Sequence, residues 1–144
     1  MQTIREINII NKSGYELPEY KTRQSAGCDL RAVLDAPVML FPSDRAFINT
    51  KISIALPEGY EAQVRGRSGL NKNHGIVVPV GTIDSDYRGE IGVTIYNISR
   101  DVYTINPGDR IAQLVITPCV QAKWNEVEVL DETDRMGGFG STGK

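Results

Sequence analysis

The class of fold is decided by residues 51–64, KISIALPEGYEAQV. The first half alternates apolar and polar side chains, as in Ile52-Ser53-Ile54, which is typical of a β-strand with one buried face. Pro57 and Gly59 then supply a turn, and a second β-rich run follows from Glu61 to Val64. A short strand, a turn and another short strand are the building unit of an all-β protein.

The same pattern recurs along the chain on both sides of this stretch. Turn formers such as Asn106-Pro107-Gly108-Asp109 separate the runs, and strands spaced about eight to twelve residues apart predict a sandwich or a barrel. One segment, Gly69 to His74, is expected to form a short helix, because no longer stretch has helical periodicity. The predicted strands are Ile4 to Ile9, Cys28 to Val33, Val38 to Phe41, Ala46 to Leu56, Glu61 to Val64, Ile76 to Val80, Ile91 to Ile98, Val102 to Ile105, Ile111 to Ile116 and Trp124 to Leu130.

Length and composition restrict the function. The 144 residues suffice for one domain with its own core, and the hydrophobic fraction of 40% is ordinary for a globular protein. A formal net charge of -2 offers no broad basic field for a long nucleic acid, so a phosphate ligand should be small. No signal peptide or membrane-spanning run is recognised, and a cytoplasmic location is expected, with no membrane partner. Cys28 and Cys119 are therefore interpreted as reduced and structural.

The C-terminal segment differs from the rest of the chain. We predict a β-barrel domain over residues 1–130 and a mobile, glycine-rich tail over residues 131–144, because four glycines between Gly137 and Gly143 cannot pack a core. Residues 138–144 match the first seven positions of a Walker A loop, but a P-loop follows a strand and opens a helix, whereas here the sequence ends at Lys144. Glycine backbone N–H groups still favour a phosphate lid.

Acidic side chains follow one of the predicted strands, in the stretch from Gly81 to Glu90. Hydrolysis at phosphorus needs a group that orients and deprotonates water, and a carboxylate such as Asp84 or Asp86 can do so. The alternative is an ordinary polar hairpin with aspartates that cap the turn.

Cationic and amide side chains suited to phosphate occur in two other stretches. Arg67 and Ser68 precede the predicted helix and provide donors, although exposed Arg-Gly-Arg loops are usually only solvated. Gln113 is an amide within an otherwise apolar strand and should have a partner. Asp29, at the start of a strand, is either a surface acid or an acid that orients water around a divalent metal. No stretch supplies a metal cage made only of protein ligands, so a metal would arrive with a nucleotide.

Taken in order, these stretches resemble the five motifs of the trimeric dUTP diphosphatase (dUTPase) family. The matching segments run from about residue 25 to the end of the sequence and are Ala26-Gly27-Cys28-Asp29-Leu30, Gly66-Arg67-Ser68-Gly69-Leu70, residues 81–89, residues 108–114 and residues 137–143. The resemblance implies a jelly-roll-like β-barrel in a homotrimer whose active sites are shared between subunits. It implies hydrolysis of dUTP to dUMP and pyrophosphate, with Mg²⁺ as cofactor held mainly by the triphosphate.

The resemblance also implies a role for individual residues. Asp84 would activate the water that attacks the α-phosphorus, and Asp29 would hold waters around Mg²⁺. Tyr87 would pack under the deoxyribose and leave no space for a 2′-hydroxyl. The implied phosphate contacts are Arg67, Ser68, Gln113 and, as a clamp from the tail, Arg135. The implied uracil contacts are the backbone around Gly81, Thr82 and Ile91 and the ring of Phe139, which would stack on the base when the tail closes. Gly69, Gly140, Ser141 and Thr142 are further implied substrate contacts, and the hydroxyls of Ser141 and Thr142 would add donors for phosphate.

Three positions depart from the family pattern. Arg135 stands one residue nearer to Phe139 than the arginine of the usual tail, Cys28 replaces a frequent aromatic or aliphatic residue, and Gly66 replaces a frequent proline. Two other functions remain open at this point. A dCTP deaminase has a related fold but acts on the base, and a nucleotide-gated binding protein would use the same pocket to regulate a partner.

Overall fold

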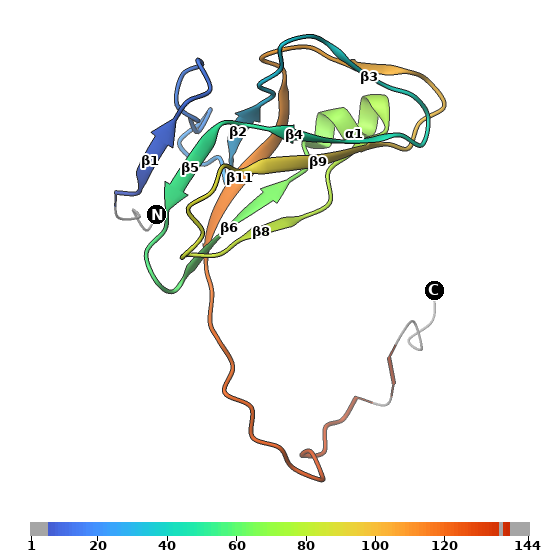
Figure 1. The fold of residues 1–144 in the computed structure, drawn as a ribbon. Helices are drawn as coiled ribbons and strands as arrows, with labels where there is room; N and C mark the ends of the chain where they lie inside the picture. The colour runs from blue at the N-terminus through green and yellow to red at the C-terminus, as the bar shows by residue number, and fades with distance from the viewer. Residues whose placement is uncertain (1–5, 136, 139–144) are drawn as a thin grey trace.

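A computed structural model describes residues 6–135, 137 and 138, and in this part of the chain it contains eleven strands and one helix (Figure 1). The all-β, jelly-roll-like prediction is confirmed. The elements are β1 (Asn8–Asn11), β2 (Cys28–Arg31), β3 (Val38–Leu40), β4 (Arg45–Asn49), β5 (Ile52–Ala55), β6 (Tyr60–Arg65), α1 (Ser68–His74), β7 (Ile76–Val77), β8 (Gly81–Ile83), β9 (Gly92–Asn97), β10 (Tyr103–Ile105) and β11 (Arg110–Pro118).

The strands form four small antiparallel sheets within the described residues. The largest has the order β2-β11-β6-β8, and the next has the order β4-β9-β7. Two-stranded ribbons, β1-β5 and β10-β3, complete the barrel. Because β2, β6 and β11 share one sheet, residues distant in sequence, such as Asp29 and Gln113, face each other as paired residues.

The long strand predicted from Ala46 to Leu56 is two strands, and this prediction is therefore corrected. Lys51 has a left-handed backbone with φ of 58°, and its N–H donates to Asn49 Oδ1 at 2.7 Å, which fixes a turn between β4 and β5. β4 pairs with β9, whereas β5 pairs with β1. The alternation of Ile52 and Ile54 thus indicated a strand correctly but could not show where the chain changes sheet.

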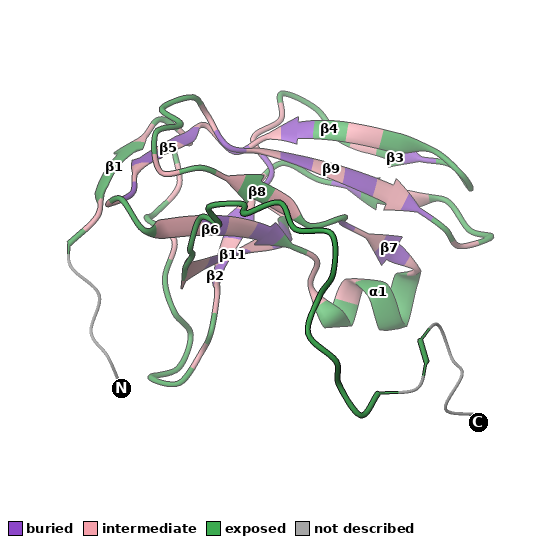
Figure 2. Ribbon diagram, turned by 90° about the horizontal axis from the view of Figure 1, so that it is seen from below, coloured by how far each residue is buried: buried purple, intermediate pink, exposed green. Residues whose placement is uncertain are grey.

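An apolar cluster of buried side chains forms the core of the barrel. Figure 2 shows the buried stretches along the strands. Alternate residues of β9 point into the core, and Val93 and Ile95 are fully buried. Aliphatic side chains from the sheet β2-β11-β6-β8 meet them, including Leu30 and Val64. Burial of such side chains stabilises the fold by roughly 1.5–3 kcal/mol each.

One buried polar side chain, Asn97, organises the end of β9. Its Nδ2 donates to the carbonyl oxygens of Leu40 at 2.8 Å and Asp101 at 2.7 Å, and its Oδ1 accepts from the N–H and hydroxyl of Ser99. The amide therefore ties the β9 turn to β3, and its full hydrogen bonding offsets the cost of burial.

The chain leaves the barrel after β11 and runs away from it, as Figure 1 shows. A strand was expected from Trp124 to Leu130, and that prediction is wrong for the single chain. The segment has the alternation of a strand, yet it pairs with none of the described strands, and Trp124, Val129 and Leu130 are about 80–90% exposed. Alternation shows that a segment is suited to a strand, but the strand forms only where a second strand is present to pair with it.

The single helix of the described residues, α1, is short and begins directly after Arg67. Gly75 ends it in a left-handed conformation with φ of 63°. The predicted range of Gly69 to His74 is confirmed to within one residue at its start. Among the described residues, no helix is long and apolar enough to cross a membrane.

Candidate active site

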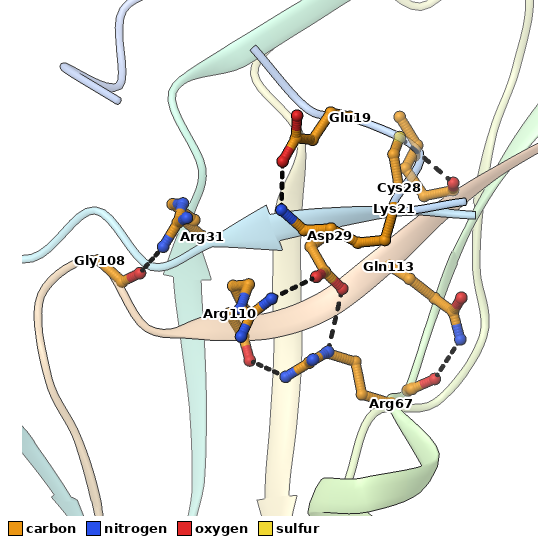
Figure 3. A network of polar contacts seen from close by, with 11 residues as sticks. Glu19, Lys21, Cys28, Asp29, Arg31, Arg67, Gly108, Arg110 and Gln113 are labelled. Atoms are coloured by element: carbon orange, nitrogen blue, oxygen red, sulfur yellow. Dashed lines mark hydrogen bonds and ion pairs between the residues drawn. The ribbon is translucent and has the colours of Figure 1, made fainter. Parts of the chain in front are cut away.

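A cluster of charged side chains lies where β2, β11 and the start of α1 meet (Figure 3). Arg67 has an extended backbone as the N-cap of α1, and its Nε lies 3.0 Å from Asp29 Oδ1. Its Nη1 also donates to the carbonyl oxygen of Arg110 at 3.0 Å. Two anchors hold the guanidinium, so it is fixed before any ligand binds.

Asp29 is placed between two cations rather than at an open surface. Its second oxygen lies 3.3 Å from Arg110 Nη1, and its side chain is 19% exposed. A shift of register between Arg110 and Ala112 brings Arg110 to this position. The sequence predicted no role for Arg110, so its contact with Asp29 was missed. Only the pairing of β2 with β11 reveals it.

Gln113 extends the cluster towards the loop before α1. The side chain is half-buried, and its Nε2 donates to the carbonyl oxygen of Gly66 at 2.9 Å. Gln113 and Arg67 line one groove of about 360 Å³, together with Ser68 of α1. The expected partner of this amide is thus a backbone carbonyl, and the second hydrogen on Nε2 can still donate to a ligand.

Gly27 lies against the Gln113 amide and leaves no space there for a side chain. A Cβ added at Gly27 would lie 2.7 Å from Gln113 Oε1 and 3.2 Å from the carbonyl oxygen of Leu114. Cys28, the next residue, is buried with its Sγ 3.6 Å from the same carbonyl oxygen. Burial raises the pKa of the Cys28 thiol, with a smaller contribution from the charge of Asp29, so the thiol stays protonated at neutral pH. Cys28 and Cys119 are both free.

The cluster can accept a metal only with help from a ligand. Within residues 6–135, 137 and 138, no three His, Cys, Asp or Glu side chains are grouped so that they could hold a metal ion. The Asp29 carboxylate contacts two arginines, yet its oxygens retain lone pairs that can order water. This donor set fits a Mg²⁺ ion that is bound mainly by a triphosphate.

A second group of polar residues follows β8. Asp84 is exposed directly after the strand, and its carbonyl oxygen accepts the N–H of Tyr87 at 3.1 Å, which closes a tight turn. Asp84 lines a broad cavity of about 710 Å³ with Asp86 and Arg88. Tyr87 is 43% exposed, and its hydroxyl donates to the carbonyl oxygen of Glu90 at 3.0 Å. An exposed carboxylate beside an open cavity can reach a water molecule and an electrophile.

The two groups lie at opposite ends of β6. β8 pairs with β6 so that Ile83 faces Ala62, which places Asp84 beside Glu61. Arg67 lies six residues further along the chain from Glu61, and a strand rises about 3.3 Å per residue, so Asp84 and Arg67 are separated by roughly 20 Å. The two cavities share no lining residue. Within one chain, Asp84 and Arg67 therefore line two separate cavities.

The positions expected to bind uracil have different environments. Gly81 and Thr82 belong to β8, and Thr82 is exposed. Ile91 is fully buried, its N–H donates to Ile52 at 2.7 Å, and its carbonyl oxygen accepts from the N–H and hydroxyl of Thr50. The structure does not support a uracil contact by the Ile91 backbone, because both of its polar groups are already bonded within the barrel.

The structure describes only some of the tail residues that were predicted to bind the substrate. Arg135 is exposed, and its Nε donates to the carbonyl oxygen of Gly137 at 2.8 Å, a contact within the tail itself. The predictions for Phe139, Gly140, Ser141 and Thr142 lie outside the described residues. Gly69, in the first turn of α1, is exposed beside Ser68, with open space around it.

These features define a class of protein: a jelly-roll-like β-barrel with cationic and amide side chains suited to an anion near one end of β6 and an exposed carboxylate, Asp84, near the other end. Comparison with known proteins narrows the class. A model of the dUTPase family matches residues 14–143, so the chain belongs to the dUTPase family.

Relatives of known name agree with this assignment. The deoxyuridine 5′-triphosphate nucleotidohydrolase of Finegoldia magna is 52% identical over 141 residues, which cover 96% of this chain and 99% of the relative. The enzyme of the same name from Ehrlichia canis is 52% identical over 139 residues, covering 93% and 91%.

Solved structures extend the likeness to three dimensions. The dUTPase of Staphylococcus bacteriophage 80alpha, solved with dUPNHPP, superposes with a TM-score of 0.87 at 28% identity and covers 97% of this chain and 99% of the phage protein. A mutant dUTPase from phage phi11 of S. aureus, solved with a structural Mg(II) ion, gives a TM-score of 0.78 at 27% identity over 87% and 98% of the two chains.

Proposed function

We propose that the protein hydrolyses dUTP to dUMP and pyrophosphate, with a water activated by Asp84 attacking the α-phosphorus. The observation that carries this proposal is the preserved order of five polar segments in a chain that matches the dUTPase family over residues 14–143. The named relatives act on deoxyuridine 5′-triphosphate, and the phage enzyme was solved with an analogue of it. The reaction would remove dUTP and supply the precursor of dTMP.

The cluster at the start of α1 is suited to the triphosphate. Arg67 has two anchoring contacts within the protein and Gln113 has one, and both side chains keep donors for phosphate oxygens. The exposed Ser68 adds a hydroxyl. Gly69 contributes a backbone N–H at the first turn of α1. Mg²⁺ bound to the triphosphate would neutralise charge that builds up on the leaving pyrophosphate, and Asp29 would order the waters around it. Positioning and charge stabilisation account for most catalysis of phosphoryl transfer.

The group after β8 would bind the nucleoside and activate water. Asp84 is exposed and free to accept a proton from water, while Tyr87 presents an open ring on which a deoxyribose can pack. The backbone of Gly81 and Thr82 would contact the uracil edge. In this proposal Arg135 and the tail residues Phe139, Gly140, Ser141 and Thr142 close over the bound nucleotide and exclude water.

In this proposal the protein is a homotrimer with shared active sites, as the resemblance to the family implies, and the separation along β6 supports the sharing of sites. Because Asp84 and Arg67 of one chain lie roughly 20 Å apart, a complete site needs Arg67 from one subunit and Asp84 from another. The exposed segment from Trp124 to Leu130 supports this assembly, since its alternating apolar side chains would be buried by a strand of a neighbouring subunit. A cytoplasmic location, with no nucleic acid polymer and no membrane as partner, completes the proposal.

The role of Asp84 is tested by Asp84→Asn, with Asp86→Asn as a matched control. Both carboxylates are exposed on the same loop, so neither change should alter the fold. Loss of a general base lowers turnover by about two to four orders of magnitude. We expect that loss in Asp84→Asn with little change in the Kd of a non-hydrolysable dUTP analogue. Undiminished turnover in Asp84→Asn, or an equal loss in Asp86→Asn, would refute the assignment.

A further inference from the structure

The ring of Tyr87 occupies the space beside Gly89 that any other residue would fill. A Cβ built at Gly89 would lie 2.6 Å from Tyr87 Cζ and 3.0 Å from Cε2, and nearer still to the phenol oxygen. Carbon atoms in ordinary contact are about 3.5–4.0 Å apart. The absence of a side chain at Gly89 is therefore what allows the ring to lie where it does.

The backbone at Gly89 does not itself require glycine. The positive-φ glycines of the described chain are Gly14, Gly59, Gly75 and Gly108, and Gly89 is not among them. An alanine can adopt the same backbone conformation at position 89 without strain. The three atoms that an added methyl group would approach most closely, outside the adjoining residues, all belong to Tyr87.

Four further contacts fix Tyr87 and its partner Glu90, two made by each residue. The Tyr87 hydroxyl donates to the carbonyl oxygen of Glu90 at 3.0 Å, and the Tyr87 N–H donates to Asp84. The Glu90 carboxylate is in turn anchored by Asn49 Nδ2 at 2.6 Å and Lys51 Nζ at 3.2 Å. One side of the ring is thus seated on the backbone, while the side chain as a whole remains 43% exposed.

We infer that Gly89 is a positioning residue for sugar selection: by seating the phenol ring of Tyr87, it sets the distance between that ring and the sugar and so determines how strongly a 2′-hydroxyl is rejected. This inference rests on the proposed function, in which Tyr87 packs under the deoxyribose. A methyl group at position 89 would displace the ring by roughly 1 Å to restore ordinary contact. A displacement of that size is comparable to the length of a C–O bond. It would therefore change the space that the ring leaves for a 2′-hydroxyl on the sugar.

The experiment compares kcat/KM for dUTP and UTP in wild type, Gly89→Ala, Tyr87→Ala and the double variant. A pocket that rejects an added hydroxyl by shape alone discriminates by about a hundredfold. We expect Gly89→Ala to lower the ratio of kcat/KM for dUTP over UTP by about tenfold. In the Tyr87→Ala background the same substitution should leave the ratio unchanged, because the methyl group then meets no ring. Thermal denaturation and light scattering check that each variant remains folded and assembled.

The possible outcomes separate this inference from the proposed function. An unchanged ratio in Gly89→Ala, with a lowered ratio in Tyr87→Ala, overturns the role of Gly89 and leaves the enzyme assignment intact. A further fall caused by Gly89→Ala when Tyr87 is absent also overturns it, since Gly89 would then act without the ring. If the ratio is unaltered in Tyr87→Ala, Tyr87 does not select the sugar, and the role inferred for Gly89 is overturned as well. A wild-type protein without dUTP turnover refutes the proposed function itself.

Discussion

Mixing two inactive variants should restore part of the activity. Asp84→Asn removes the proposed base, and Arg67→Ala removes a phosphate contact at the other end of β6, roughly 20 Å away. Arg67→Ala should leave the fold intact, because Asp29 retains its contact with Arg110 at 3.3 Å. If each site takes Arg67 from one chain and Asp84 from another, some sites in a mixed trimer contain only intact residues.

The expected recovery can be calculated. After unfolding an equal mixture and refolding it, subunits assemble at random. A site is intact when its Arg67 comes from an Asp84→Asn chain and its Asp84 comes from an Arg67→Ala chain. Each condition holds for half of the chains, so about one quarter of the sites should be intact. Pyrophosphate release from dUTP should reach about one quarter of the wild-type rate.

The control is a mixture of variants from the same end of β6. Asp84→Asn refolded with Tyr87→Ala should be no more active than the average of its two components, because every site then takes a defective residue from that end. If the Asp84→Asn and Arg67→Ala mixture is likewise no more active than its components, the two residues do not come from different chains.

Three other predictions concern the tail, the core and acid stability. Deletion of residues 137–144 should preserve the assembly in light scattering and lower turnover by about a hundredfold, and full activity would show that the tail is no lid. Asn97→Ala should lower the free energy of unfolding by about 3 kcal/mol in urea denaturation, because buried carbonyl groups lose their donor, and a loss below about 1 kcal/mol would contradict the role of this amide. Hydrogen bonds from Asn49 and then Lys51 lower the pKa of Glu90 below its ordinary value of 4.5. The difference in Tm between wild type and Glu90→Gln should therefore be full at neutral pH and shrink only as the pH falls below 4.5. A difference in Tm that grows on acidification would contradict this.

The fold was predictable from the sequence where local pattern decides it. Ile52 and Ile54 are buried as their alternation indicates, and the turn at Pro57 to Gly59 joins β5 to β6. The same alternation at Val127-Glu128-Val129 gave a wrong strand, because pairing depends on a second strand that the single chain does not provide. The division of Ala46 to Leu56 depends on the left-handed backbone of Lys51, a residue whose side chain carries no turn signal.

The site was predictable only at the level of residue types. Arg67, Gln113 and Asp29 were expected to bind phosphate or metal waters, and the structure brings all three to one surface. The partnership of Asp29 with Arg110 depends on the register shift in β11, which no local pattern indicates. Likewise, nothing in the sequence shows that the Ile91 backbone is already bonded within the barrel, because those bonds join residues about 40 positions apart.

The proposed reaction is tested by pyrophosphate release with Mg²⁺ from dUTP, dCTP, dTTP and UTP, with base deamination followed in the same samples. We expect release from dUTP alone and no deamination. Deamination of dCTP would move the function to the related deaminases, release from all four nucleotides would contradict the proposed selectivity, and the absence of any turnover would favour a nucleotide-gated binding protein.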